Sequence, residues 1–131
     1  MHPELAPLYR SEHPEQSVLA LKRFLLVAKS RGDAALCAEL LGLVARCQWL
    51  AGELDAAQES LNDVEFVLID SKLRGGQVEA RYLMERALWF AACGLAAPAA
   101  KSARESLALA EEPLAGELEA LWSELSDGRR G

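Results

Sequence analysis

A repeat of 42 residues limits the folds open to this chain more than any other feature. Shifting the sequence around Gly52 by 42 residues places it over the sequence around Gly94. The matched positions keep their residue type: Ala38/Ala80, Leu41/Leu83, Ala45/Ala87, Ala57/Ala99 and Ser60/Ser102. Small residues recur where two helices of a hairpin approach closely, and glycine recurs where the chain reverses. Because one hairpin cannot bury its own apolar face, each copy is expected to cover the next.

Glycine and proline divide the rest of the chain into helix-length segments as well. Leu, Ala and Glu dominate, and only 6% of residues are aromatic, which favours helix over strand. Apolar residues recur at helical spacing within each segment. Six helices are predicted, with starts at Pro14, Asp33, Asp55, Gln77, Pro98 and Pro113. The β-prone run EFVLID (65–70) is assigned to the third helix, because no second strand is available to pair with it.

The repeat resembles the tetratricopeptide repeat (TPR) family. That family has a small residue in each helix of the hairpin and a glycine before the turn. This chain matches all three positions twice, first as Ala45, Gly52 and Ala57 and then as Ala87, Gly94 and Ala99. The large apolar positions match less well, since Gln48 replaces the usual Tyr and Leu61 and Ala103 replace the usual Phe. The period also exceeds the usual 34 residues, as in the long-helix variants of the family. The resemblance implies an all-α, right-handed superhelical array of antiparallel hairpins with about six helices.

This architecture predicts a single domain at 15–127 between two short ends. It consists of a half repeat (15–32), two repeats (33–75 and 76–112) and a capping helix (113–127). Residues 1–14 are expected to be a loose segment, and 128–131 a C-terminal tail. The capping helix carries an apolar stripe that should cover the fifth helix: Leu114, Leu118, Leu121, Trp122 and Leu125.

Composition and motifs argue against several classes of function. A net charge of −6 provides no basic face for nucleic acid. No apolar stretch is long enough to span a membrane, and the start Met-His-Pro-Glu does not resemble a secretory leader, so a cytoplasmic protein is expected. The three cysteines should therefore be reduced, and the presence of only two histidines, both near the N-terminus, argues against a metal site. Phosphate-binding loops, nucleophile elbows and triads are absent from the sequence, so neither an enzyme nor a cofactor is expected.

In the TPR family the first helix of each hairpin lines a concave groove that binds peptides. The resemblance therefore implies a partner-binding groove formed by Glu39, Arg46, Trp49, Leu50, Arg81, Met84 and Leu88. Arg46 and Trp49 lie one turn apart, and an exposed Trp beside an Arg is a typical binding anchor. The competing interpretation is that Trp49 belongs to the core. Gly42 and Met84 stand where a chaperone-tail clamp would need polar donors, which argues against that subtype.

The expected function is that of a non-catalytic adaptor or regulatory module that binds a protein or peptide. The alternative is a structural homodimer or assembly subunit that associates through an exposed apolar helix face.

Overall fold

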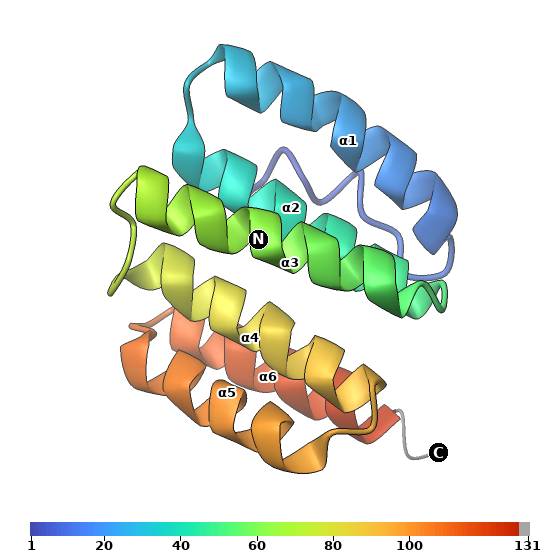
Figure 1. Ribbon diagram of the computed structural model, residues 1–131, viewed down its shortest axis with the longest axis vertical. Helices are drawn as coiled ribbons and strands as arrows, with labels where there is room; N and C mark the ends of the chain where they lie inside the picture. Colours follow the sequence, from blue (N-terminus) through green and yellow to red (C-terminus); the bar gives the residue numbers. More distant parts are fainter. Residues whose placement is uncertain (129–131) are drawn as a thin grey trace.

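The computed structural model describes residues 1–128, and in this range the chain forms six α-helices and no strands (Figure 1). The helices are α1 (Pro14–Ser30), α2 (Ala34–Leu50), α3 (Leu54–Asp70), α4 (Gln77–Ala92), α5 (Ala96–Leu109) and α6 (Leu114–Gly128). The all-α prediction is confirmed, and so is the assignment of residues 65–70 to a helix. The predicted tail lies outside the described residues, apart from Gly128 at the end of α6.

The two glycine turns have the same structure. Gly52 and Gly94 both adopt a left-handed backbone conformation, with φ of 84° and 78°. A side chain at either position would be strained, whereas glycine is not. In each turn, the N–H of the residue after the glycine donates to a carbonyl five residues back: Glu53 to Gln48 at 2.8 Å, and Leu95 to Phe90 at 2.9 Å. These bonds satisfy carbonyls that the helix end would otherwise leave unpaired. Because the glycine conformation and the hydrogen bond agree, the two turns are equivalent, as the repeat predicts.

The helices lie in two layers that follow from their contacts. Helix α4 packs on α2 at one side and on α6 at the other, so α2, α4 and α6 form an inner layer. Helices α1, α3 and α5 pack against the inner layer and do not contact one another. Figure 1 shows the resulting stack, with α1 at one end and α5 at the other. Helix α6 packs on α4 as well as on α5, the helix that the sequence predicted it to cover.

Small residues allow the close approach within each hairpin. Ala45 on α2 and Ala57 on α3 are both almost completely buried, as are Ala87 on α4 and Ala99 on α5. A cluster of buried apolar residues extends through α2, α3, α4, α5 and α6. A second cluster joins α1 and α2 to the N-terminal segment.

The prediction that residues 1–14 are loose is wrong. The side chain of Leu5 is fully buried and belongs to the cluster that contains Leu21 of α1 and Leu40 of α2. Leu8 and Tyr9 pack against the same cluster. Helix α1 alone leaves one side of α2 uncovered, and these apolar side chains cover it.

Candidate functional site

The N-terminal segment, residues 1–13, makes polar contacts with two of the three helices of the inner layer, α2 and α6. The amide of His2 donates to Glu39 of α2 at 2.9 Å, and the Met1 ammonium group contacts Glu117 of α6. Further along, the Tyr9 ring lies 5.0 Å from the guanidinium carbon of Arg46. The surface of α2, α4 and α6 that this segment crosses is called the inner face below.

Arg46 and Glu85 form a buried ion pair at the centre of the inner face. The Nε of Arg46 donates to Oε1 of Glu85 at 3.0 Å, and the terminal Nη2 of Arg46 donates to Oε2 of the same carboxylate. Burial would lower the pKa of Arg46, but the adjacent Glu85 more than offsets this effect, and the pKa is raised. Arg46 is therefore permanently charged and engaged with Glu85, so its side chain is not available to a partner.

A second, more accessible set of charges surrounds Arg81 of α4. Its guanidinium lies 2.7 Å from Glu117 and 3.8 Å from Glu39. Burial would raise the pKa of Glu117, but hydrogen bonds from the Met1 amino group and Arg81 outweigh this effect and lower it. Both Arg81 and Glu39 remain partly exposed. The lowered pKa keeps Glu117 ionised at neutral pH, and the cluster remains in contact with solvent.

Beside this cluster lies a pocket of about 340 Å³. The first turns of α2 and α4 and the start of α6 border it through Leu36, Val78 and Leu114. Glu39 and Arg81 supply charged groups in its wall, and His2 belongs to the wall as well. A mostly apolar cavity with a few polar groups is the usual chemistry of a binding site.

The structure separates the predicted groove residues into two groups. Glu39 and Arg81 line the pocket. The other five are withdrawn from solvent: Arg46, Trp49, Met84 and Leu88 are buried, and Leu50 is half-buried against the core. The prediction that Trp49 is an exposed anchor beside Arg46 is wrong, because Trp49 is only 6% exposed and belongs to the core cluster.

Sequence reasoning missed Tyr9, Glu85 and Glu117 as parts of this face. Glu85 pairs with Arg46 across 39 residues, and no local pattern connects the two. The N-terminal segment did offer a signal, since Leu5, Leu8 and Tyr9 provide three large apolar or aromatic side chains in five residues. Such a composition is typical of a segment that packs against the core.

The described residues place no group of three or more His, Cys, Asp or Glu side chains where they could hold a metal ion. Within the same range, none of the helices combines the length and apolar character needed to cross a membrane. Cys37 and Cys47 are buried thiols that form no disulfide. Comparison of the chain with protein-family models, curated proteins and solved structures gave no match.

Proposed function

We propose that this chain is a non-catalytic, TPR-like interaction module that binds a peptide segment of a partner protein in the pocket of the inner face. The TPR-like assignment is supported by the two equivalent glycine turns and by the buried alanines of both hairpins. It is also supported by the packing of α2 on α4 and of α4 on α6, because repeat hairpins stack through successive first helices.

One observation carries the binding proposal: the inner face already holds a non-helical stretch of its own chain beside an open pocket. Glu39 accepts a backbone N–H from this stretch, which is the contact that a bound peptide would offer. The apolar wall formed by Leu36, Val78 and Leu114 suits one or two apolar side chains of a ligand. Arg81 and Glu39 can orient the backbone or a charged neighbour of such a ligand.

The pocket offers little to a catalytic mechanism. The residues in its wall include no serine, cysteine or lysine that could act as a nucleophile. Two of its acidic residues are held in structural contacts, since Glu85 pairs with Arg46 and Asp33 accepts the N–H of Leu36 at the start of α2. Arg81 and Glu39 remain partly exposed, which suits contact with a ligand. Binding is therefore the function that this chemistry favours.

The test is selection of peptides from a random display library on the wild-type chain, followed by calorimetric titration of the selected sequences. Ala35 lies in the pocket wall and is exposed, so Ala35→Trp should fill the pocket without disturbing the core. We expect this variant to weaken binding by about tenfold or more. Ala108→Trp is the matched control, since Ala108 is exposed on α5 and lies outside the pocket. Equal binding to both variants, or no selected peptide, would refute the proposal.

A further inference from the structure

The outer surface of α1 and α3 carries most of the exposed apolar side chains. Of the large apolar residues exposed within residues 1–128, all but Leu95 lie on these two helices. Leu26 on α1 is 68% exposed and Phe66 on α3 is 69% exposed, and Leu19 and Ile69 accompany them. Single exposed apolar residues need no explanation, but their concentration on two helices of one layer indicates an interface.

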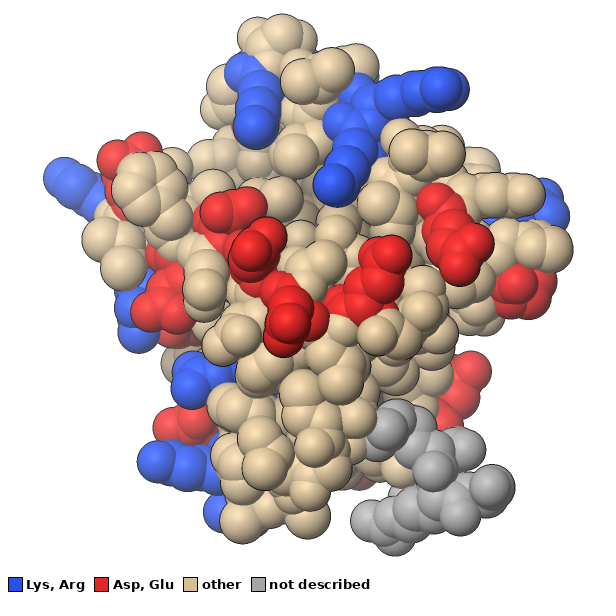
Figure 2. Space-filling model, turned by 45° about the vertical axis from the view of Figure 1, so that its right-hand side comes forward, with Lys and Arg blue, Asp and Glu red and all other residues tan. Residues whose placement is uncertain are grey.

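The charges around Leu26 on α1 and around Phe66 on α3 are opposite in sign, although the first turn of α1 also carries the exposed acid Glu15. On α1, the exposed bases Lys22 and Lys29 lie four residues before and three residues after Leu26, so they share its side of the helix. On α3, Phe66 stands between the exposed acids Asp63, three residues before it, and Asp70, four residues after it. Glu59 extends this acidic stripe by one turn. In Figure 2 basic side chains gather at the top of the molecule, above a band of acidic side chains. One surface thus combines a basic apolar helix with an acidic apolar helix.

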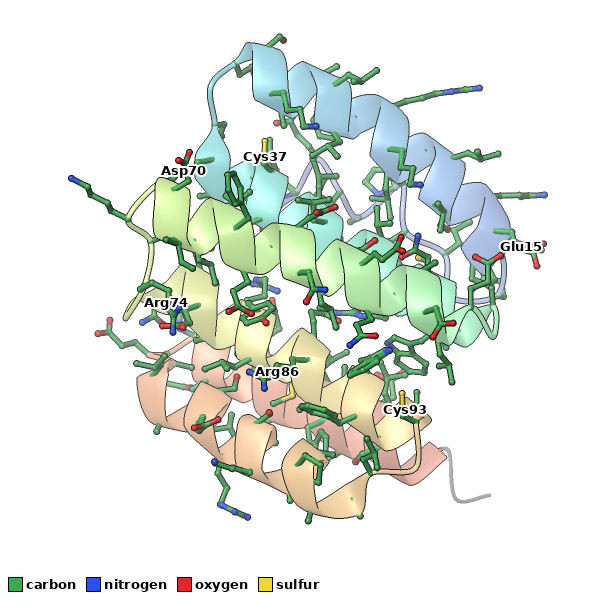
Figure 3. All side chains as sticks on the ribbon, in the orientation of Figure 1. Glu15, Cys37, Asp70, Arg74, Arg86 and Cys93 are labelled. Carbon is green, nitrogen blue, oxygen red and sulfur yellow. The ribbon has the colours of Figure 1, made fainter. Side chains whose placement is uncertain are left out.

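The directions of the two helices decide how such a surface can meet a copy of itself. Both α1 and α3 are antiparallel to α2, so they run in the same direction (Figure 1). In Figure 3, Glu15 in the first turn of α1 and Asp70 at the end of α3 lie at opposite ends of the surface. A twofold axis parallel to the helices places α1 of one copy on α3 of the other. An axis in the interface plane but perpendicular to the helices would instead bring like charges together.

We propose that α1 and α3 form a self-complementary surface through which two copies of this chain associate, with α1 of each copy packed on α3 of the other. This arrangement removes the four most exposed apolar side chains of the two helices from water: Leu19, Leu26, Phe66 and Ile69. The lysines of α1 face the carboxylates of α3 in both halves of the interface, which fixes its orientation. Each helix has 17 residues and is about 25 Å long, so the pair can supply the roughly 800 Å² per partner of a stable interface.

This surface differs from the one suggested by the sequence. If the apolar stripe of α6 were wider than the fifth helix can cover, its remainder would favour self-association. Instead, Leu118 is fully buried, and Leu114, Leu121, Trp122 and Leu125 pack against the core. The proposed dimer does not involve the inner-face pocket, so a test of the dimer does not depend on whether the pocket binds a peptide.

The experiment exchanges charges between the two helices. One variant carries Lys22→Glu and Lys29→Glu, and a second carries Asp63→Lys and Asp70→Lys, the two acids that flank Phe66. All four side chains are exposed, so helical content and thermal stability should be retained. Sedimentation equilibrium over a concentration series measures association of the wild-type chain, of each variant alone, and of an equimolar mixture of the variants.

We expect the wild-type chain to form dimers and each variant alone to associate at least about tenfold more weakly, because like charges then face each other. The mixture should recover wild-type affinity, since acidic α1 meets basic α3 in one half and basic α1 meets acidic α3 in the other. Lys101→Glu with Arg104→Glu on α5 is the control for charge reversal elsewhere and should associate like the wild-type chain. A monomeric wild-type chain, variants that dimerise normally, or a mixture that fails to recover would each overturn the proposal.

Discussion

Arg46 of α2 and Glu85 of α4 pair as a guanidinium and a carboxylate with both side chains only 3% exposed. The neighbouring Gly42 makes room for this pair, because a Cβ at that position would lie 3.3 Å from the Cγ of Glu85. The guanidinium also lies over the ring of Tyr9 in the N-terminal segment, with 5.0 Å between its carbon and the ring centroid. The ion pair therefore connects two successive inner helices with the segment that covers them.

Removing one member of this pair should be more harmful than removing both. Glu85→Leu leaves the Arg46 charge buried without its partner and should cost about 3–5 kcal/mol of unfolding free energy. The double variant Arg46→Met with Glu85→Leu should lose less than either single variant, because no unpaired charge remains. Urea denaturation of the two single variants and the double variant gives the coupling energy. Strictly additive losses would contradict a direct ion pair.

The N-terminal segment should contribute to stability as a part of the core does. Leu5→Ala removes a fully buried side chain and should lower the unfolding free energy by about 2–4 kcal/mol. The exposed Leu95 offers the same substitution as a control, with an expected change within about 0.5 kcal/mol. Urea denaturation of both variants measures the difference. Equal, small losses would mean that the segment is loose after all.

The parts of the structure that sequence predicted correctly are those set by local chemistry. Gly52 and Gly94 end helices because of their own backbone freedom, and Ala57 and Ala99 are small because a neighbouring helix lies close to them. The packing of the N-terminal segment on the inner face could not be predicted in this way. Periodicity identifies which helices face inward, but it does not reveal what covers them.

The prediction that Arg46 and Trp49 face a groove was wrong for the same reason: the sequence does not show what covers α2. Both lie on α2, which α1, α3, α4 and the N-terminal segment enclose, so almost every side of this helix is buried. A repeat helix at an open groove would leave one side to solvent. The sequence of α2 is indeed apolar on nearly all sides, and this composition was the available signal of burial.

Enlarging the alanines at the hairpin crossings should destabilise both repeats. Ala57→Leu and Ala99→Leu insert extra volume at positions that have no access to solvent, and each should cost about 1–3 kcal/mol. Ala97→Leu is the control, since Ala97 lies on the exposed side of α5. Thermal melting monitored by circular dichroism compares the three variants. Melting temperatures that all match the wild-type value would contradict close-packed hairpins.

Stability should fall at alkaline pH because the folded chain holds several protons more tightly than the unfolded chain, those of Cys47 and Tyr82 most of all. Burial raises the pKa of Cys47 from 9.0 to about 12. Burial also raises the pKa of Tyr82 from 10.0 to about 12, with a further contribution from the nearby Glu65 carboxylate. Between pH 9 and 12 the unfolded chain therefore binds fewer protons, and the unfolding free energy decreases as pH rises.

Urea titrations at a series of pH values measure this slope, which amounts to at most about 1.4 kcal/mol per pH unit for each proton. Cys47→Ala should make the slope shallower from pH 9 upward, and Tyr82→Phe should do so only above pH 10. A stability that is flat from pH 9 to 12 in the wild-type chain would show that neither group is shielded from water.

Substitutions at Trp49 test directly whether this residue belongs to the core or to an open groove. Because its side chain is buried in the core, Trp49→Ala should cost about 3–5 kcal/mol, whereas an exposed binding anchor would cost little. Trp49→Phe should retain most of the stability, since the ring still fills most of the volume. Urea denaturation of both variants, compared with Trp122→Ala on the half-buried surface of α6, ranks the three positions. A loss below about 1 kcal/mol for Trp49→Ala would place this residue at an open groove and return Arg46 and Trp49 to the candidate binding site.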